Sequence, residues 1–422
     1  MWQFIKRFLE DIKTDLYHSS LLFSGNFAAQ IITFLAYPVI TRLYSASQFG
    51  EFSLFLSITS ILAILATGRL EFALMLPESD IEAHNLKKIG ARWCLIFSMA
   101  CVLISLILGQ IGKFNKTIPG LYWIGLYVFL TGIVQIFTLY RNREKQYKTL
   151  AKVSVLQNAS TSGTKIIFGF AQSISHGLIW GNIIGQLITA IAISKGYISQ
   201  TFKSRPASIK ATLQKYSAFP KYRMIQAIIN SLSSNLPIFF ITYYFSTKES
   251  GYYALVLGIA YKVIGLITQA LYQVLYRRFA ELNNKQEPIL PIFFKIIILL
   301  FFTGFIPCAF IFIFAKPLVL LFFGNSWIET SIYIKMMLPW LIMVLIAQPF
   351  GFITDIFSLQ KQSLIFDIIH LLMRITALYI GFWFNNVYLS IILFSVSSIT
   401  FILSLLGWYY IIIKKHSVII MR

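Results

Sequence analysis

Long apolar runs separated by short polar segments make up most of this chain. A run of roughly 18 residues or more with few charges can cross a bilayer as an α-helix. A membrane β-barrel would instead show short segments of alternating apolar and polar residues. The runs predict an all-α membrane protein with twelve spans, at about residues 19–41, 50–76, 91–111, 119–140, 153–172, 177–196, 225–246, 251–275, 290–315, 332–354, 364–384 and 388–413. Prolines inside these runs predict kinks at Pro38, Pro237, Pro307 and Pro349.

One segment of the pattern occurs twice. Residues 38–54 read PVITRLYSASQFGEFSL and residues 237–255 read PIFFITYYFSTKESGYYAL. Each has a proline inside an apolar run, then an aromatic–Ser pair, a polar turn and Gly-x-aromatic-x-Leu, which starts at Gly50 and at Gly251. The copies lie close to half the 422-residue chain apart, so a unit of six spans is used twice. An even number of spans makes the repeat parallel, with a pseudo-twofold axis along the membrane normal and a cavity where the lobes meet.

The expected domains follow from this division of the chain. They are a cytoplasmic amphipathic helix at 1–18, a six-helix N-terminal lobe at 19–196, a cytoplasmic linker at 197–224, a six-helix C-terminal lobe at 225–413 and a cytoplasmic tail at 414–422. In residues 2–17, apolar side chains recur at helical spacing, which predicts a helix on the membrane surface. The same residues carry too many charges for a cleavable signal peptide.

The basic residues predict the orientation of the spans. Cytoplasmic loops of membrane proteins are enriched in Lys and Arg. With the N-terminus inside, most of the 36 basic residues fall on the cytoplasmic side, among them Lys87 and Lys88 after the second span. The opposite side holds only Arg42, Lys113, Lys116, Lys248 and Lys316. We therefore expect both termini to be cytoplasmic, in a multi-pass protein of the bacterial inner membrane.

Composition excludes several other classes. The chain is 57% hydrophobic and 12% charged, whereas soluble domains have about 25% charged residues. Its net charge of +21 would suggest nucleic acid in a soluble protein, but the cytoplasmic loops explain it without such a partner. Cys94, Cys101 and Cys308 all lie in apolar runs, so we expect neither disulfides nor a metal site. Nucleotide-binding and zinc-protease motifs are absent from the sequence, and no cofactor is expected.

Ionisable residues inside the spans are the candidate site residues. Each costs at least ~2.5 kcal/mol in a bilayer unless it meets a partner or water. Lys165 in the fifth span shares a helix face with Thr161 and Asn158. Lys262 in the eighth span shares a face with Gln269. Neither lysine has an acidic neighbour in its span, which favours a water-filled cavity around both.

Further charged residues lie near the ends of spans or at spacings where two of them share a helix face. Asp367, His370 and Arg374 share one face of the eleventh span, where a structural pair is an equally good interpretation. Arg69 and Glu71 are two residues apart in the last turns of the second span, so we expect them not to face each other and to need other partners.

Arg42 ends the first span beside the repeated turn, and Asp355 ends the tenth near the cytoplasm. Both positions also suit side chains that merely reach an interface. The deep charges are mainly cationic, and a cationic lumen attracts an anionic passenger.

Several motifs carry a resemblance to a known family. They are T-R-L-Y-S, F-G-E-F-S-L, R-L-E-F-A-L-x-L-P and F-P-K-Y, in residues 41–45, 49–54, 69–77 and 219–222. With their flanking residues they resemble Wzx-type O-antigen and polysaccharide flippases, of the polysaccharide transporter family in the multidrug/oligosaccharidyl-lipid/polysaccharide exporter superfamily. The resemblance covers most of the chain and implies a fold like that of multidrug and toxin extrusion (MATE) transporters.

The resemblance implies a function that is not enzymatic. Such flippases move an undecaprenyl-diphosphate-linked oligosaccharide, an O-antigen or capsule repeat unit, across the inner membrane by alternating access, with H⁺ or Na⁺ coupling. The lipid bilayer, a polysaccharide polymerase and a chain-length regulator are the expected partners. The cations expected to bind the passenger are Arg42, Arg69, Lys165, Lys262 and Arg374. The carboxylates available for ion coupling are Glu71, Asp355 and Asp367. Of these residues, Arg374 and Asp367 are inferred from their spacing and not from the resemblance.

Three alternatives remain open. A drug/cation antiporter of the MATE class would favour an acidic lumen, whereas the deep charges here are mainly cationic. A lipid II flippase of peptidoglycan synthesis typically has additional spans. A membrane enzyme of the same pathway, such as a polymerase or ligase, needs a large periplasmic loop, and every predicted outer loop is short.

Overall fold

The computed structural model describes residues 24–111, 118–171, 176–203, 209–357 and 359–420. Nearly all of these residues are helical, and these ranges contain no β-strand. The predicted all-α class is confirmed. The amphipathic helix predicted at 1–18 lies outside the described residues.

Ten helices within these ranges are long and apolar enough to cross a membrane, so this is a multi-pass membrane protein. They include α2 (Ala46–Thr67), α4 (Asp80–Gln110), α6 (Ile124–Arg143), α8 (Gly177–Ser194), α11 (Met224–Tyr244), α12 (Thr247–Lys285), α13 (Leu290–Phe323), α14 (Thr330–Ala347), α16 (Gln360–Trp383) and α17 (Val387–Ile420). Two further helices, residues 24–43 and the more polar α7 (Tyr147–Ala171), are also of membrane length. The count of twelve spans stays a prediction.

Several helices extend well beyond the predicted spans. The apolar run of α12 ends near residue 275, but the helix continues to Lys285 and has 39 residues. At about 1.5 Å per residue this is ~58 Å, whereas the hydrocarbon core of a bilayer is ~30 Å thick. Likewise α4 begins at Asp80, ahead of its apolar run. Hydropathy detects only the part of a helix that lies in lipid, so the polar ends of these helices were predicted as loops.

The prolines that were predicted to kink helices lie in different settings. Pro237 and Pro307 lie inside α11 and α13. The one residue of α13 with non-helical dihedrals is Phe314 (φ −98°, ψ 17°), three residues before Pro317, which the sequence did not single out. Pro349 lies in a 3₁₀ turn, Gln348–Phe350, after α14. Since proline lacks an amide hydrogen and clashes with the preceding turn, Pro317 explains the bend of α13.

The chain divides into two compact units, and the first comprises residues 1–44 and Glu51–Leu232. Within it α7 and α8 pack along their whole length. Two α8 glycines permit this contact, because a Cβ on Gly181 would lie 2.7 Å from the Lys165 amide nitrogen and one on Gly185 would lie 2.6 Å from the Thr161 Cα. Small residues four apart let membrane helices approach closely.

The segment predicted as a linker folds onto the first unit. It forms the short helices α9 (Ile198–Lys203) and α10 (Ile209–Lys215), followed by a π-helical turn over Phe219–Arg223. Arg92 of α4 donates to the Phe202 carbonyl oxygen at 3.3 Å. The Lys215 ammonium lies 2.6 Å from the Glu82 carboxylate, which raises the lysine's pKa. The segment is therefore attached to the start of α4.

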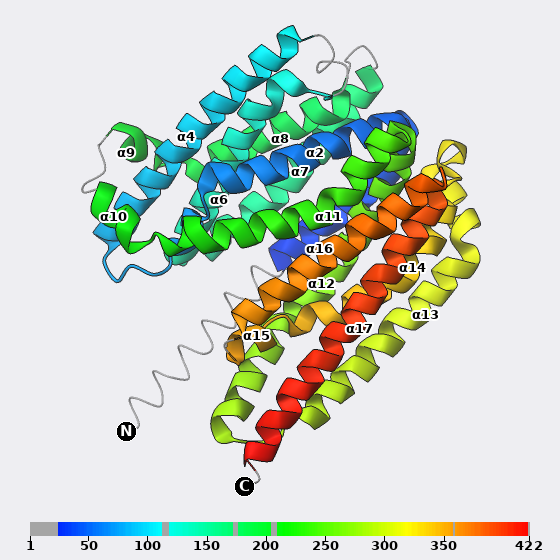
Figure 1. Ribbon diagram of the computed structural model, residues 1–422. Coiled ribbons are helices and arrows are strands. Elements are labelled where there is room, and N and C mark those ends of the chain that lie inside the picture. The colour runs from blue at the N-terminus through cyan, green and yellow to red at the C-terminus, as the bar shows by residue number, and fades with distance from the viewer. Residues whose placement is uncertain (1–23, 112–117, 172–175, 204–208, 358, 421–422) are drawn as a thin grey trace. The chain divides into compact units, whose positions relative to one another are not determined.

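The second unit comprises Ser45–Gly50 and Ser233–Arg422. Figure 1 shows α12, α13, α14, α16 and α17 of this unit running alongside one another. Its core is rich in aromatic rings, such as Phe293, which packs on Phe350 with centroids 4.9 Å apart. The Ser45–Gly50 segment lies against the start of α12, where the hydroxyl oxygens of Ser47 and Thr247 are 2.7 Å apart.

Candidate functional site

Lys165 lies where α7 meets the first copy of the repeated segment. It is half-buried, and its Nζ is 4.4 Å from the centroid of the Phe52 ring in α2. The Tyr44 hydroxyl donates to the Lys165 carbonyl oxygen at 2.7 Å. Tyr44 and Phe52 both belong to the repeated motif. The repeat therefore supplies two contacts to this residue, one ring over its ammonium group and one hydroxyl on its backbone.

The other polar residues of α7 bond to neighbouring helices. The Thr33 hydroxyl donates to the Asn158 side-chain oxygen at 2.7 Å, and the Asn158 amide donates to the Ser154 carbonyl at 2.9 Å. The Gln157 amide donates to the Gln186 side-chain oxygen at 2.9 Å. On the predicted polar face of α7, Asn158 therefore bonds to the helix at 24–43, whereas the Thr161 hydroxyl donates within α7, to the Gln157 carbonyl at 2.7 Å.

Arg69 and Glu71 form an ion pair, so the prediction that they need other partners is wrong. An Arg69 guanidinium nitrogen lies 3.5 Å from a Glu71 carboxylate oxygen, and only 1% of the Glu71 side chain is exposed. That prediction assumed a continuous helix. In fact α2 ends at Thr67, Gly68 and Arg69 are left-handed (φ 58° and 57°), and α3 begins at Leu70. This change of direction turns Arg69 back toward Glu71.

Two predicted cations of the second unit differ in their surroundings. Lys262 of α12 is half-buried, with exposed Tyr261 and Val263 on either side in sequence. Arg374 of α16 is buried. Its guanidinium donates to the Ser233 carbonyl and hydroxyl oxygens at 3.2 and 3.1 Å and to the Ser398 hydroxyl at 3.2 Å. Arg374 therefore connects α11, α16 and α17.

The remaining predicted residues lie at separate places. Arg42 is exposed near the end of the helix at 24–43, and Asp355 is exposed in the short helix α15 (Ile353–Ile356). Asp367 is half-buried on α16. One turn further along α16, the His370 ring stacks on Phe401 with centroids 3.8 Å apart. Among the described residues no group of three His, Cys, Asp or Glu side chains could hold a metal ion.

Lys87 is a buried cation of α4. The sequence pattern places it in a loop between two spans, and this prediction is wrong because α4 begins seven residues earlier, at Asp80. The Lys87 side chain is fully buried. Its Nζ lies 3.6, 4.7 and 5.8 Å from the ring centroids of Tyr140, Tyr197 and Phe137. The three rings replace part of the hydration that the ammonium group loses on burial. No local sequence pattern marks this position, because the three rings come from α6 and from the chain after α8.

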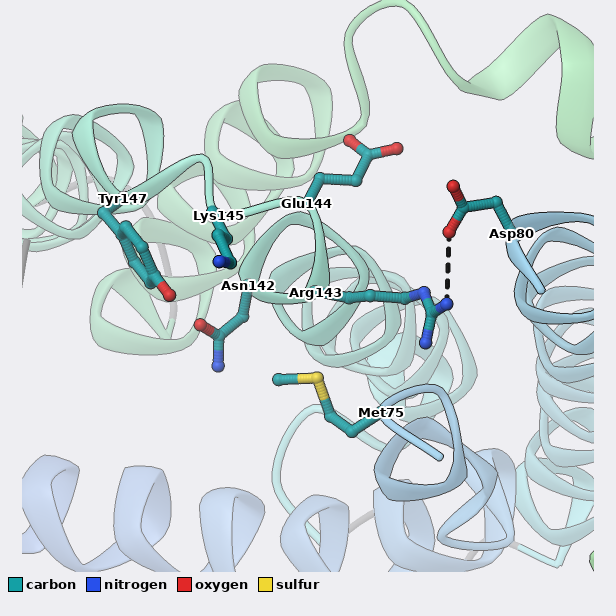
Figure 2. Close-up of a pocket in the computed structure, with 7 residues that line it drawn as sticks. All are labelled: Met75, Asp80, Asn142, Arg143, Glu144, Lys145 and Tyr147. Carbon is teal, nitrogen blue, oxygen red and sulfur yellow. Dashed lines mark hydrogen bonds and ion pairs between the residues drawn. The ribbon is translucent and has the colours of Figure 1, made fainter. Parts of the chain in front are cut away.

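A polar pocket opens beside this cluster, at the turn between α6 and α7. Its volume is about 570 Å³, and it is lined by Met75, Asp80, Asn142, Arg143, Glu144, Lys145 and Tyr147. Figure 2 shows the Arg143 side chain reaching toward Asp80, above Met75. The two charged groups are 3.1 Å apart, and Arg143 also donates to the Leu74 carbonyl at 3.2 Å. Every lining residue belongs to the first unit.

Comparison with known families gives a match over most of the chain. Residues 39–332 match the sequence profile of a family described as "Polysaccharide biosynthesis protein". A protein of Klebsiella pneumoniae described as "Uncharacterized membrane protein in cps region" is 19% identical over 368 residues, which are 84% of this chain and 74% of that protein.

Solved structures share the fold. The lipid II flippase MurJ in an inward closed conformation aligns with a TM-score of 0.69 at 14% identity, over 94% of this chain and 91% of that one. A multidrug resistance MATE family transporter in an inward-facing conformation aligns with a TM-score of 0.63 at 14% identity, over 92% and 95% of the two chains. At such identities the likeness concerns the fold, and the predicted MATE-like architecture is confirmed.

Proposed function

The chain belongs to the family of polysaccharide biosynthesis proteins, and from this membership we propose that it is a flippase. Its passenger would be an undecaprenyl-diphosphate-linked oligosaccharide, an O-antigen or capsule repeat unit. The protein would carry this unit from the cytoplasmic to the periplasmic leaflet of the inner membrane, with both of its own termini in the cytoplasm. A polysaccharide polymerase and a chain-length regulator would act on the unit afterwards.

The observation that carries this proposal is the family match over residues 39–332 of a chain composed of membrane helices. A polysaccharide biosynthesis protein composed of membrane helices is suited to a step that takes place within the bilayer. Moving a charged diphosphate through hydrocarbon is costly, and a pathway lined by protein removes most of that cost. Alternating access of two six-helix lobes is the mechanism that the repeat suggests.

Lys165 and Lys262 are the two cations that we propose for the diphosphate. Both lie on membrane helices and are half-buried, so each could be reached by a passenger while much of its side chain is shielded from water. Low dielectric surroundings strengthen the attraction between an ammonium group and a phosphate. Arg42, exposed at the end of the helix at 24–43, would meet the passenger near the outer face.

We propose different roles for the other predicted charges. The guanidinium of Arg374 is engaged by Ser233 and Ser398, which suits a residue that holds the second unit together. Glu71 is the most buried of the three candidate carboxylates, and its partner is Arg69. Protonating a buried carboxylate changes the free energy of the folded protein more than protonating an exposed one. We therefore propose Glu71, rather than Asp355 or Asp367, as the site of ion coupling.

Deletion of the gene tests the proposal. We expect surface polysaccharide to be lost and lipid-linked repeat units to accumulate on the cytoplasmic side, with both effects reversed by the wild-type gene on a plasmid. A strain that keeps full-length surface polysaccharide and accumulates no lipid-linked units would overturn the proposal. A changed drug sensitivity with unchanged polysaccharide would instead identify a drug/cation antiporter.

A further inference from the structure

The lining residues of the pocket at the α6–α7 turn bond to one another and to residues around the pocket. The Glu144 carboxylate accepts hydrogen bonds from the Tyr197 hydroxyl and, at 2.7 Å, from the Gln146 amide. Arg143 donates to the Leu74 carbonyl and to the Asp80 carboxylate. Lys145 adopts a left-handed backbone conformation (φ 56°) that forms the turn. The volume of the pocket lies within the ~300–1,000 Å³ range of small-ligand sites.

Two of the lining groups remain available to a ligand. Within the described parts of the chain, the Asn142 side-chain amide and the Lys145 ammonium make no hydrogen bond or ion pair. An amide offers two donors and an acceptor, and an ammonium offers three donors. The Asn142 side chain is half-buried and lies beside Met75 in Figure 2. The pocket therefore combines charges that are already paired or hydrogen-bonded with two lining groups, on Asn142 and Lys145, that can bond a ligand.

The charges of the lining balance, which restricts the class of ligand. Arg143 and Lys145 oppose Asp80 and Glu144, so the lining itself carries no net charge that would favour a phosphate or a drug cation. Its planar carboxylate, amide and guanidinium groups can each bond two neighbouring hydroxyls. The ring of Tyr147 and the thioether of Met75 offer apolar surface. A neutral polyhydroxylated ligand fits this combination best.

We propose that this pocket binds a sugar residue of the lipid-linked passenger before translocation. The inference rests on the proposed function, which makes the passenger a saccharide and places this turn on the cytoplasmic side. The pocket would hold the sugar part while the diphosphate enters the membrane between the helices. Selection among repeat units would then depend in part on Asn142 and Tyr147.

Saturation-transfer NMR on the purified full-length protein in lipid nanodiscs tests the proposal. The probe is the oligosaccharide released by mild acid from the host's own lipid-linked repeat units. We expect binding by the wild type and by the control Lys148→Ala, whose side chain is exposed and outside the pocket lining. Asn142→Leu and Tyr147→Ala should each weaken binding about tenfold, as expected when one or two good contacts are lost.

Inorganic diphosphate serves as the competitor. It should leave the sugar signal unchanged, and displacement by it would overturn the assignment of a neutral site. Equal binding by the wild type and both pocket variants would also overturn it, whatever the deletion strain shows. If instead the pocket variants lose binding while the deletion strain keeps its polysaccharide, the pocket assignment stands and the proposed flippase function fails.

Discussion

Gly50 and Gly251 make the same contact in opposite directions. A Cβ on Gly50 would lie 1.8 Å from the Thr247 carbonyl oxygen, and a Cβ on Gly251 would lie 1.8 Å from the Ala46 carbonyl oxygen. Ala46 and Thr247 each precede a glycine by four residues, at the starts of α2 and α12. Such reciprocity is what a twofold axis produces. Within the second unit, the contact therefore pairs equivalent residues of the Ser45–Gly50 segment and of the start of α12.

Replacing either glycine by alanine should destabilise the fold. A methyl group at 1.8 Å from a backbone oxygen cannot be accommodated by moving a side chain, so the backbone itself must shift. We expect Gly50→Ala and Gly251→Ala each to cost about 3 kcal/mol, seen as a lower midpoint in heating followed by size-exclusion chromatography.

Gly265→Ala is the matched control, because Gly265 lies on the same helix as Gly251 and its Cβ would meet nothing within 4 Å. It should leave the midpoint unchanged or raise it, since alanine favours helix. Wild-type midpoints in both contact variants would show that the reciprocal contact does not constrain the folded protein.

Much of the fold was predictable because apolar runs and a repeat record it directly. The all-α class and the correspondence of Gly50 with Gly251 need only the spacing of residues. The ends of α4 and α12 were not predictable from hydropathy, since residues outside the bilayer carry no apolar signal. The bend of α13 depends on Pro317 rather than on every proline in a run, and which proline bends a helix depends on packing.

Reversing the charge of the two half-buried lysines should abolish transport. A carboxylate in place of an ammonium repels a diphosphate, and the change in interaction is large where water is excluded. We expect Lys165→Glu and Lys262→Glu each to lower surface polysaccharide at least ~tenfold at normal protein level. Lys152→Glu, at an exposed position of α7, is the control. Full polysaccharide from both lysine variants would refute the cationic pathway.

Removing the buried guanidinium of the second unit should affect folding before transport. Arg374→Ala leaves the Ser233 and Ser398 oxygens without their donor and opens a cavity, at a cost of about 3 kcal/mol. We expect less folded protein in detergent extracts, whereas Lys361→Ala on the exposed face of the same helix should have no effect. Arg374→Lys should recover only part of the loss, because lysine lacks the planar fork. Normal folding with lost transport would place Arg374 on the passenger's route.

The contact between Lys87 and the aromatic rings around it can be measured with a double-mutant cycle. Tyr140→Leu removes the ring nearest to the Lys87 ammonium and leaves a buried charge with fewer partners. Lys87→Met removes the charge and keeps the length of the side chain. We expect Tyr140→Leu to destabilise the wild type by about 1 kcal/mol more than it destabilises Lys87→Met. Additive losses of thermal stability would mean that the rings pack against Lys87 without stabilising its charge.

The candidate site was predictable only where an ionisable residue lies inside a predicted span. Lys165 and Lys262 stand out because each is the one charged residue of its predicted span. The Arg69–Glu71 pair depends on two left-handed residues, and of these only Gly68 is a residue type that suggests such a conformation. The aromatic rings around Lys87 come from α6 and from the chain after α8, and no local sequence pattern predicts contacts so distant in sequence.

The bend of α13 has a consequence for how this helix responds to force. Pro317 offers no amide hydrogen to the Ile313 carbonyl, so the backbone there lacks one of the bonds that stiffen a helix. Most side chains of α13 are exposed at the surface of the protein, and only 11% of an 18-residue apolar stretch of this helix is buried. Lateral pressure from the lipid therefore acts on two stiff rods joined near Phe314, and any deflection is concentrated at that joint.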